Sequence, residues 1–301
     1  MKHIAASRRK VLLTGASGLL GSTLVKTLGQ LCELYLTSSR ELATDARMPF
    51  LAFDLEDDDF TPLRDFCQPD AVVHCAAMTS IEECERDPDA AWRINGLSPA
   101  KLQRIFPEAY FVHVSTDAVF GLDAVAPDED FPPAPISEYG KSKLAGERGL
   151  LTSAAAAVVL RTTLVGSGGR RTTPSLVDWL MAGFTAGKAL LLYEDVFFTP
   201  ISVWHFAEVI AWCLAHQPVG VLHAGGGERL SKKDFALRLA REAGLGDIPF
   251  KATRLAESAS GTLRRLDQSL DSGRLQQCMG KPLPNADACV RSIVENHGVD
   301  A

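Results

Sequence analysis

The chain has 301 residues, of which 46% are hydrophobic and 23% charged, and its formal net charge at pH 7 is −6. These values are ordinary for a globular protein of one large or two modest domains, and the acidic balance argues against a nucleic-acid partner. Every apolar stretch is shorter than the ~18 residues that a membrane helix needs, so we expect no membrane partner and a cytoplasmic location.

Seven cysteines are scattered along the chain, and none forms a C-x-x-C pair. An odd count without metal-ligand spacing predicts a reducing compartment, no structural disulfide and no metal site. The basic N-terminus, MKHIAASRRK, is followed by an apolar run that is too short for a signal peptide.

Short apolar segments alternate with helical patterns over residues 10–161. The expected strands are Lys10–Thr14, Glu33–Thr37, Pro49–Phe53, Ala71–Cys75, Tyr110–Ser115 and Ala156–Arg161. The expected helices are Leu19–Leu28, Phe60–Cys67, Pro88–Phe106 and Glu138–Leu151. Apolar strands separated by helices predict a parallel sheet covered on both faces, which is the doubly wound α/β (Rossmann) fold.

The pattern changes after Arg161, where a Gly-rich basic loop covers residues 166–174. Further elements are expected at Pro174–Gly187, Val203–His216, Val221–Gly225 and Asp287–Asn296, and in a helix that Ser231-x-x-Asp234 opens with a capping box. We expect residues 1–165 to form a dinucleotide-binding domain, with 203–225 returning to it. Residues 166–301 would form a smaller C-terminal α/β lobe that binds substrate.

Residues 14–21 read TGASGLLG, with glycines at positions 15, 18 and 21, between the first expected strand and helix. Glycines allow a tight turn and a close approach of backbone to a pyrophosphate, and the helix N-terminus supplies N–H donors. The alternative is a plain strand-to-helix turn. We expect a dinucleotide to contact Gly15, Ser17, Gly18, Leu19 and Leu20.

The second expected strand ends in Thr-Ser-Ser-Arg, without the acidic residue that usually binds the ribose 2′-hydroxyl of NAD. Arg40 can hold a 2′-phosphate with paired hydrogen bonds, and Ser39 adds a hydroxyl. The cofactor is therefore predicted to be NADP(H) rather than NAD(H), unless Arg40 is only a solvated loop charge. Asp54 and Leu55, after the third strand, are expected near the adenine.

Tyr139-Gly140-Lys141-Ser142-Lys143 places a tyrosine and a lysine four residues apart on an expected helix. A nearby ammonium favours the phenolate, so we expect Lys143 to lower the pKa of Tyr139 toward neutrality. Upstream, HVSTD (113–117) ends the fifth strand at the carboxyl edge of the sheet, where open α/β sheets bind ligands. Chance spacing is the competing interpretation of the Tyr–Lys pair.

Together these residues resemble the short-chain dehydrogenase/reductase superfamily in its extended form. The closer resemblance is to the dTDP-4-dehydrorhamnose reductase (sugar-nucleotide-binding) family, and it extends over nearly the whole chain. The segments that carry it are HCAAMTSIEECERDPDAAWRINGLSPAKL (74–102), STDAVFG (115–121), YGKSKLAGE (139–147) and LRRLDQSLD (263–271).

The resemblance implies that Thr116, Tyr139 and Lys143 are the catalytic residues of an NADP(H)-dependent keto-sugar reductase. Tyr139 would protonate the carbonyl oxygen, Thr116 would orient that oxygen, and Lys143 would tune Tyr139 and hold the nicotinamide ribose. Asn95 would brace the site. The remaining residues are expected along the cofactor (Cys75, Ala76, Ala77) or at the substrate (Thr79, Asp117).

Three stretches depart from the family pattern and leave the sugar undetermined. Leu164 stands where a tryptophan is usual, the 121–137 loop lacks the aromatic residue often found before its glutamate, and Arg264-Arg265 replaces an Arg-Pro pair. The Pro-rich 121–137 loop either covers the substrate or is a passive surface loop. Arg170 and Arg171 could clamp the diphosphate of a nucleotide sugar, or they belong to a solvated loop. Three histidines on expected strands are interpreted as satisfied core residues: His74, His113 and His223.

The leading interpretation is therefore an NADP(H)-dependent reductase of a keto nucleotide-sugar. Two alternatives stay open. One is a nucleotide-sugar epimerase or dehydratase, which usually retains NAD and favours an acidic end to the second strand. The other is a non-catalytic, NADP-binding regulatory subunit of a partner enzyme, because such a subunit can keep an intact site. The resemblance also suggests a homodimer, although the sequence shows no clear exposed apolar stripe.

Overall fold

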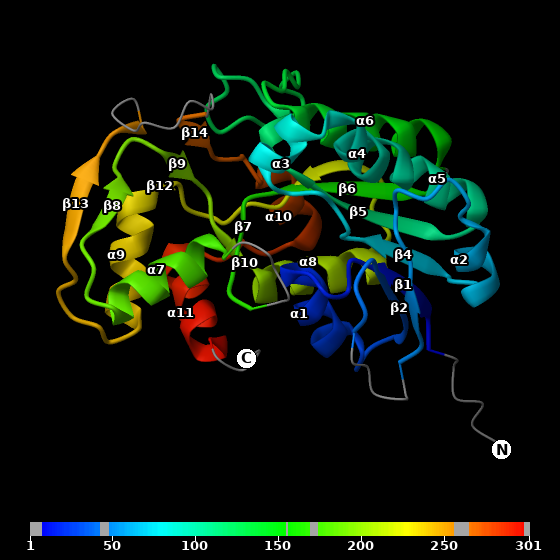
Figure 1. The fold of residues 1–301 in the computed structure, drawn as a ribbon, viewed down its shortest axis with the longest axis horizontal. Helices are drawn as coiled ribbons and strands as arrows, with labels where there is room; N and C mark the ends of the chain where they lie inside the picture. Colours follow the sequence, from blue (N-terminus) through cyan, green and yellow to red (C-terminus); the bar gives the residue numbers. More distant parts are fainter. Residues whose placement is uncertain (1–7, 43–47, 155, 169–173, 256–264, 298–301) are drawn as a thin grey trace.

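The computed structural model describes residues 8–42, 48–154, 156–168, 174–255 and 265–297 (Figure 1). The predicted diphosphate clamp, Arg170 and Arg171, lies outside these ranges. All seven cysteines lie within them and are free thiols. In the described part of the chain, no helix combines the length and the hydropathy needed to cross a membrane.

Seven parallel strands form the central sheet, in the order β11-β6-β5-β4-β1-β2-β3. Their bounds are β1 (Lys10–Thr14), β2 (Glu33–Ser38), β3 (Phe50–Ala52), β4 (Ala71–His74), β5 (Tyr110–Thr116), β6 (Ala157–Thr162) and β11 (Gly220–His223). The strand order reverses between β1 and β4, so this is the switch point of a doubly wound sheet. The predicted α/β Rossmann fold is confirmed.

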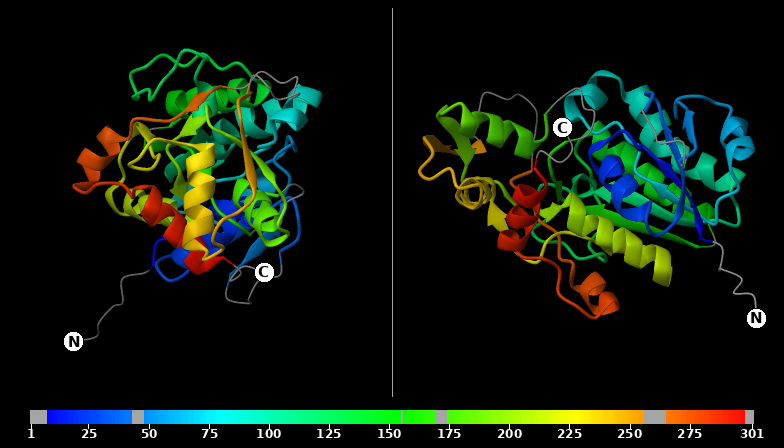
Figure 2. Two further views of the ribbon diagram at one scale, coloured as in Figure 1. Left: turned by 90° about the vertical axis from the view of Figure 1, so that its left-hand side faces the viewer. Right: turned by 90° about the horizontal axis from the view of Figure 1, so that it is seen from below.

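Helices cover both faces of the sheet because alternate residues of each strand point to opposite sides. From β1, Val11 and Leu13 pack in a cluster with α1 (Leu19–Leu28) and α8 (Val203–His216). Leu12 points the other way, into a cluster with α2 (Thr61–Phe66), α5 (Ser98–Ile105) and α6 (Glu138–Ser153). The two layers are visible in Figure 2.

The single helix expected over residues 88–106 is broken. It consists of α4 (Pro88–Ala91), a π-helical turn η1 (Trp92–Leu97) and α5, and a further helix α3 (Ile81–Arg86) precedes it. π-Helical turns often lie at functional sites, since the extra residue re-aims a side chain. Here the turn contains Asn95, which was expected to brace the active site.

A smaller α/β unit stands beside the carboxyl edge of the sheet (Figure 1). Its helices α7 (Leu176–Thr185), α9 (Lys232–Glu242) and α11 (Ala286–Asn296) share a second hydrophobic cluster. Its short strands, which the sequence analysis did not predict, are β8 (Leu190–Tyr193) with β13 (Phe250–Thr253), and β12 (Leu230–Ser231), β9 (Phe197–Phe198) and β14 (Asp267–Gln268).

Two local features connect this unit with the predictions. The Ser231 hydroxyl caps α9 by accepting the Asp234 N–H at 3.0 Å, as the motif indicated, while the Asp234 carboxylate accepts the Ser231 hydroxyl at 2.8 Å. The parallel pair β7 (Leu164–Val165) and β10 (Ile201–Ser202) carries the chain between the sheet and the smaller unit. The helix α10 (Gly273–Met279) returns toward the sheet, where Leu275 is buried.

Candidate active site

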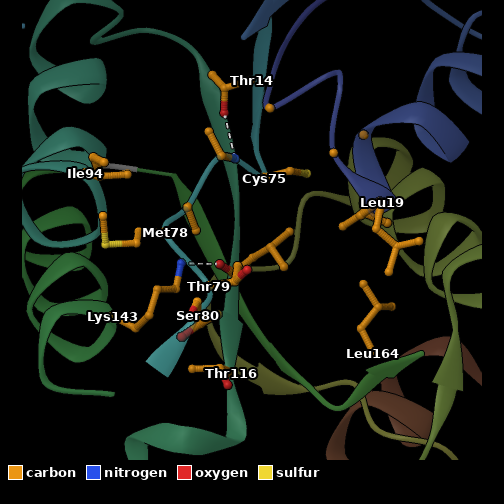
Figure 3. A pocket seen from close by; sticks show the side chains of 18 of the residues that line it. Thr14, Leu19, Cys75, Met78, Thr79, Ser80, Ile94, Thr116, Lys143 and Leu164 are labelled. Atoms are coloured by element: carbon orange, nitrogen blue, oxygen red, sulfur yellow. Dashed lines mark hydrogen bonds between the residues drawn. The ribbon is translucent and has the colours of Figure 1, made fainter. Parts of the chain in front are cut away.

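A cavity of about 770 Å³ lies where the carboxyl ends of the strands meet the smaller unit (Figure 3). Every predicted catalytic, cofactor-binding and substrate-binding residue in the described part of the chain lines this cavity. These residues are Gly15, Ser17, Gly18, Leu19, Leu20, Ser39, Arg40, Asp54, Leu55, Cys75, Ala76, Ala77, Thr79, Thr116, Asp117, Tyr139 and Lys143. The fold therefore gathers into one site residues that are more than one hundred positions apart.

The turn after β1 is shaped for close backbone approach. Gly15 has φ +70°, and a Cβ there would stand 2.7 Å from the backbone nitrogen of Ala76, in the segment that follows β4. Gly18 caps α1 with its backbone and without a side-chain hydrogen bond, so the first N–H groups of the helix remain available. Such a turn fits the pyrophosphate of a dinucleotide, because no side chain stands between the anion and the helix N-terminus.

The end of β2 supplies the groups that would distinguish NADP from NAD. Ser39 and Arg40 are exposed and line the cavity, and no carboxylate precedes them on this strand end. The buried hydroxyl of Thr37 has no hydrogen-bond partner among the described residues. Beyond β3, Asp54 accepts the Glu56 N–H at 3.0 Å, so part of its carboxylate is already engaged.

Asn95 joins three parts of the site, as the sequence analysis expected of a bracing residue. Its Oδ1 accepts the Met78 N–H at 3.0 Å, and its Nδ2 donates to the Met78 carbonyl at 3.0 Å and to Ser142 Oγ at 3.1 Å. The amide side chain is buried. The segment after β4 is thereby fixed to α6, the helix that carries Tyr139 and Lys143.

The start of α6 is held close to the end of β5. Ser137 caps the helix by accepting the Gly140 N–H at 3.1 Å. A Cβ on Gly140 would stand 2.2 Å from the carbonyl oxygen of Ala118, so only glycine permits this approach. The contact places the Tyr139 side chain beside that of Thr116. The close backbone approach and the surrounding residues hold these two side chains in position.

Burial raises the pKa of the Tyr139 phenol, the charge of Asp117 adds to this rise, and a hydrogen bond with Thr116 lowers it. The expectation that Lys143 would lower this pKa toward neutrality is wrong for the structure described. Removal from water disfavours the phenolate more than the hydrogen bond favours it. Tyr139 is consequently a neutral hydroxyl at physiological pH, which is the form that donates a proton.

Lys143 lines the cavity but is almost fully buried, with its ammonium donating to the Val114 carbonyl at 2.7 Å. Burial lowers its pKa to about 8, a shift that the charge of Glu147 partly opposes. The Lys143 Nζ also lies 3.4 Å from His113 Nε2. A lysine poised in this way can be protonated at neutral pH and still respond to a small change in its surroundings.

The three strand histidines are buried, but they are not equivalent. Both ring nitrogens of His74 have a hydrogen-bond partner, the Thr14 hydroxyl at 2.7 Å and the Ser98 hydroxyl at 3.2 Å. His223 contacts the Pro127 carbonyl at 3.0 Å. His113 Nδ1 has no partner among the described residues, so the interpretation of a fully satisfied core histidine fails there.

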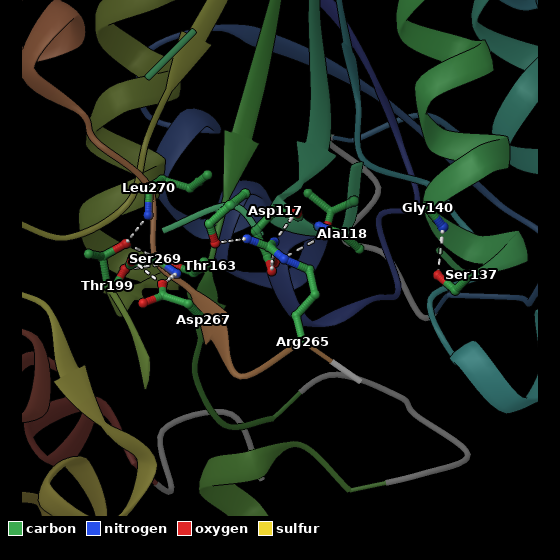
Figure 4. A network of polar contacts seen from close by, with 12 residues as sticks. Asp117, Ala118, Ser137, Gly140, Thr163, Thr199, Arg265, Asp267, Ser269 and Leu270 are labelled. Carbon is green, nitrogen blue, oxygen red and sulfur yellow. Dashed lines mark hydrogen bonds and ion pairs between the residues drawn. The ribbon is translucent and has the colours of Figure 1, made fainter. Parts of the chain in front are cut away.

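Asp117 is held by a residue from the far end of the chain (Figure 4). Arg265 Nη1 donates to the Asp117 carbonyl at 2.7 Å and lies 3.3 Å from the Asp117 carboxylate. Burial raises the pKa of Asp117, and the charges of Arg265 and Lys232 oppose that rise. The sequence analysis treated Arg265 only as a departure from the family pattern and missed this role.

The smaller unit contributes Phe198, Lys232 and Gln268 to the cavity wall, and none of them was predicted. Leu164, at the position where a tryptophan is usual, also lines the wall. The 121–137 loop does not, because none of its residues borders the cavity. Instead it packs against the C-terminal region through bonds such as Ala126 N–H to Ser269 Oγ at 3.2 Å. The passive interpretation fits this loop better.

The geometry of the fold and of the site defines the class of protein. A parallel Rossmann sheet with a glycine turn, a Tyr-x-x-x-Lys helix and a smaller C-terminal unit defines an extended short-chain dehydrogenase/reductase, an NAD(P)-dependent oxidoreductase. Residues 9–298 match the family described as "RmlD substrate binding domain", and the chain belongs to that family. The predicted family and enzyme class are confirmed.

Three relatives illustrate the range of the family. A probable low-salt glycan biosynthesis reductase of Haloferax volcanii is 32% identical over 91% of this chain and 94% of its own length. A probable dTDP-4,6-dihydroxy-2-methyloxan-3-one 4-ketoreductase of Streptomyces antibioticus is 33% identical over 76% of each chain. Methionine adenosyltransferase 2 subunit beta of Xenopus laevis is 27% identical over 91% of this chain and 84% of its own.

Two solved structures share the fold. A dTDP-4-dehydrorhamnose reductase of Clostridium acetobutylicum superposes with a TM-score of 0.83 and 26% identity, over 95% of this chain and 98% of its own. The corresponding enzyme of Bacillus anthracis, solved in complex with NADP, gives a TM-score of 0.81 at 21% identity, over 96% and 99%. The predicted cofactor, NADP(H), agrees with that complex.

Proposed function

We propose that the protein reduces the keto group of a nucleotide sugar with NADPH. The observation that carries this proposal is the single cavity that holds the glycine turn, Arg40 and the set Thr116, Tyr139 and Lys143. We also propose that residues 1–165 with 203–225 bind the dinucleotide, while the rest of residues 166–301 closes the substrate side. The pairing of β11 with β6 supports this division.

The nicotinamide, when bound, supplies hydride, and the residues of the chain supply position and one proton. Tyr139, kept neutral by burial, donates its proton to the carbonyl oxygen of the substrate. Thr116 Oγ1 accepts the Ala118 N–H at 3.1 Å and donates its hydrogen to Asp117 Oδ1 at 3.3 Å. In this proposal that hydrogen turns from Asp117 to the substrate oxygen and orients it. Lys143, anchored on the Val114 carbonyl, offers its remaining hydrogens to the ribose.

NADPH is preferred over NADH in this proposal because of the charge at the end of β2. A 2′-phosphate would meet the guanidinium of Arg40 and the hydroxyl of Ser39, and no carboxylate of this strand end would repel it. This argument also disfavours an epimerase or dehydratase that retains NAD.

The substrate class follows from the relatives whose names describe dTDP sugars and from the size of the cavity. We infer a dTDP-linked 4-keto sugar or a close analogue, bound between Thr116 and the wall formed by Phe198, Leu164 and Gln268. Leu164 gives this chain an aliphatic surface where an aromatic ring is usual, so sugar stacking on that wall is weaker here.

The test is NADPH oxidation, followed by absorbance, with a dTDP-4-keto-6-deoxy sugar as substrate. Tyr139→Phe should lower kcat by about 10²–10⁴-fold, the usual contribution of a general acid, with NADPH affinity retained. Tyr35→Phe is the matched control, since the Tyr35 hydroxyl bonds Glu33 at 2.8 Å on the surface, away from the cavity. Equal turnover by Tyr139→Phe and the wild type would refute the proposed role.

A second candidate function has a separate test, because the relative from Xenopus laevis, which this chain matches over 84% of its length, is named as a subunit of another enzyme. The chain would then bind NADP and a partner protein without turnover. Affinity purification of the tagged chain, followed by mass spectrometry, checks this. A stoichiometric partner together with no reduction of any keto sugar tested would favour the subunit function over catalysis.

A further inference from the structure

Lys232 is a cation in the cavity wall that the proposed reaction does not use. It is the first residue of α9, and its ammonium lies 3.4 Å from the centroid of the Phe198 ring. Its side chain borders the cavity together with Thr116, Asp117 and Gln268. It therefore stands on the substrate side, opposite the residues of the Rossmann sheet.

The acidic groups near Lys232 are already engaged by arginines. Asp117 is paired with Arg265, and Asp267 accepts two hydrogen bonds from Arg229, at 2.8 and 2.5 Å. Within the described ranges, no oxygen lies at hydrogen-bond or ion-pair distance from Lys232 Nζ. The group formed by Asp117, Arg265 and Lys232 thus carries one positive charge in excess when all three are ionised.

This position is unfavourable for the folded chain. The N-terminal end of a helix repels a cation, and Lys232 stands in the first turn of α9. Burial lowers the pKa of Lys232 to about 8, and Asp117 only partly opposes that shift. The partners of this ammonium are the face of the Phe198 ring and the more distant charge of Asp117, and no anion of the described residues contacts it directly. A charge held at a locally unfavourable position in this way is typical of a functional site.

We propose that Lys232 binds an oxyanion of the substrate at the end of the cavity that holds Thr116 and Asp117. The inference rests on the proposed function, because it takes the occupant to be a nucleotide sugar. The oxyanion is either the diphosphate or a carboxylate on the sugar ring, and both accept charge-assisted hydrogen bonds from an ammonium. With a sugar carboxylate as partner, Lys232 selects which keto sugars the enzyme accepts, and with the diphosphate as partner it holds the part that all nucleotide sugars share.

The experiment compares Lys232→Met with Lys233→Met in the full chain saturated with NADP. Methionine keeps an unbranched side chain over Phe198 and removes the charge together with its cation–π contact. Lys233 is the matched control, because it pairs with Glu194 at 3.5 Å and borders a different hollow, with Asp195 and Arg254. Calorimetric titrations use thymidine, dTDP, dTDP-glucose and dTDP-glucuronate as probes.

If the diphosphate is the partner, Lys232→Met lowers the affinity for dTDP and dTDP-glucose about tenfold or more and leaves the affinity for thymidine unchanged. If a sugar carboxylate is the partner, only the affinity for dTDP-glucuronate falls. Lys233→Met changes none of these affinities. Equal affinities of Lys232→Met and the wild type for all four probes, or no binding of any probe to the wild type, would overturn the inference.

Two further measurements separate the possible failures. Thermal unfolding of the ligand-free variant should give a Tm close to that of the wild type, because the loss of the cation–π contact with Phe198 is offset by relief of the repulsion at the helix N-terminus; a large fall would show that Lys232 is structural and refute the inference. Lys232→Arg should retain most of the affinity. Probe binding that depends on Lys232, with no reduction of any keto sugar, would overturn the proposed function while supporting this site.

Discussion

Gly140 and Ala118 pack so closely that a Cβ on Gly140 would stand 2.2 Å from the Ala118 carbonyl oxygen. This contact joins the helix that carries Tyr139 to the turn that follows Thr116. The separation between the proposed proton donor and the residue that orients the carbonyl is therefore set by a backbone contact. Small backbone changes at this point should affect catalysis before they affect the fold.

Gly140→Ala should consequently lower kcat/KM by about 10²-fold, the size of effect that an ångström of misplacement produces. Overpacking should also cost about 1–3 kcal/mol in the free energy of unfolding, measured by urea denaturation. Gly149→Ala, on the same helix, is the control, because its nearest contact would be an ordinary 3.5 Å. Matching effects of the two substitutions would show that the close approach at Gly140 is unimportant.

Arg40→Ala should raise the KM for NADPH by about 10–100-fold, as expected for the loss of hydrogen bonds to a charged group, and leave the KM for NADH nearly unchanged. Initial rates with both cofactors measure this. Arg148→Ala, another exposed arginine that does not border the cavity, serves as the control. A parallel loss with NADPH and NADH would mean that Arg40 does not contact a 2′-phosphate.

The pH dependence of reduction should report Lys143. Its pKa of about 8 means that the ammonium loses its proton as the pH rises through that value, whereas Tyr139, whose pKa burial raises, stays protonated. Activity that needs both protons should therefore be constant below a pH of about 8 and decline above it, by about tenfold per pH unit. A kcat/KM profile that remains flat well into the alkaline range would exclude this assignment.

Glu147→Gln should destabilise the fold by about 3–5 kcal/mol, because it leaves a buried charge without its partner. Glu147 and Arg161 form a buried pair at 2.7 Å, and Ser115 adds a short bond of 2.5 Å to the same carboxylate. Urea denaturation provides the measurement. Glu208→Gln removes the exposed pair with Lys281 and should change stability by at most ~1 kcal/mol. Similar small losses for both variants would contradict the buried-pair argument.

The local signals in the sequence were sufficient for most of the Rossmann half of the molecule. The expected bounds of β1, α1 and α8 agree with the structure residue for residue. These elements have a clear apolar periodicity and well-defined ends, so the residues nearby in the sequence determine their type and their bounds. The helix over residues 88–106 was predicted unbroken because nothing in the local pattern marks the π-helical turn that aims Asn95.

The short strands of the smaller unit could not be predicted in the same way. The strands β9, β12 and β14 have two residues each, and they exist only because the fold brings them side by side. A two-residue segment has no periodicity of its own, so its hydrogen bonding depends on partners distant in sequence.

The sequence by itself determined the nucleotide turn at Gly15, the arginine at the end of β2 and the Tyr139–Lys143 spacing, because each is a local pattern with a local physical cause. Only the tertiary structure decided the charges of the site. Arg265 reaches Asp117 across 148 positions, and Lys232 enters the cavity from a separate unit. Burial then sets the protonation of Tyr139 and Lys143, since desolvation depends on what surrounds a group in space rather than on its neighbours along the chain.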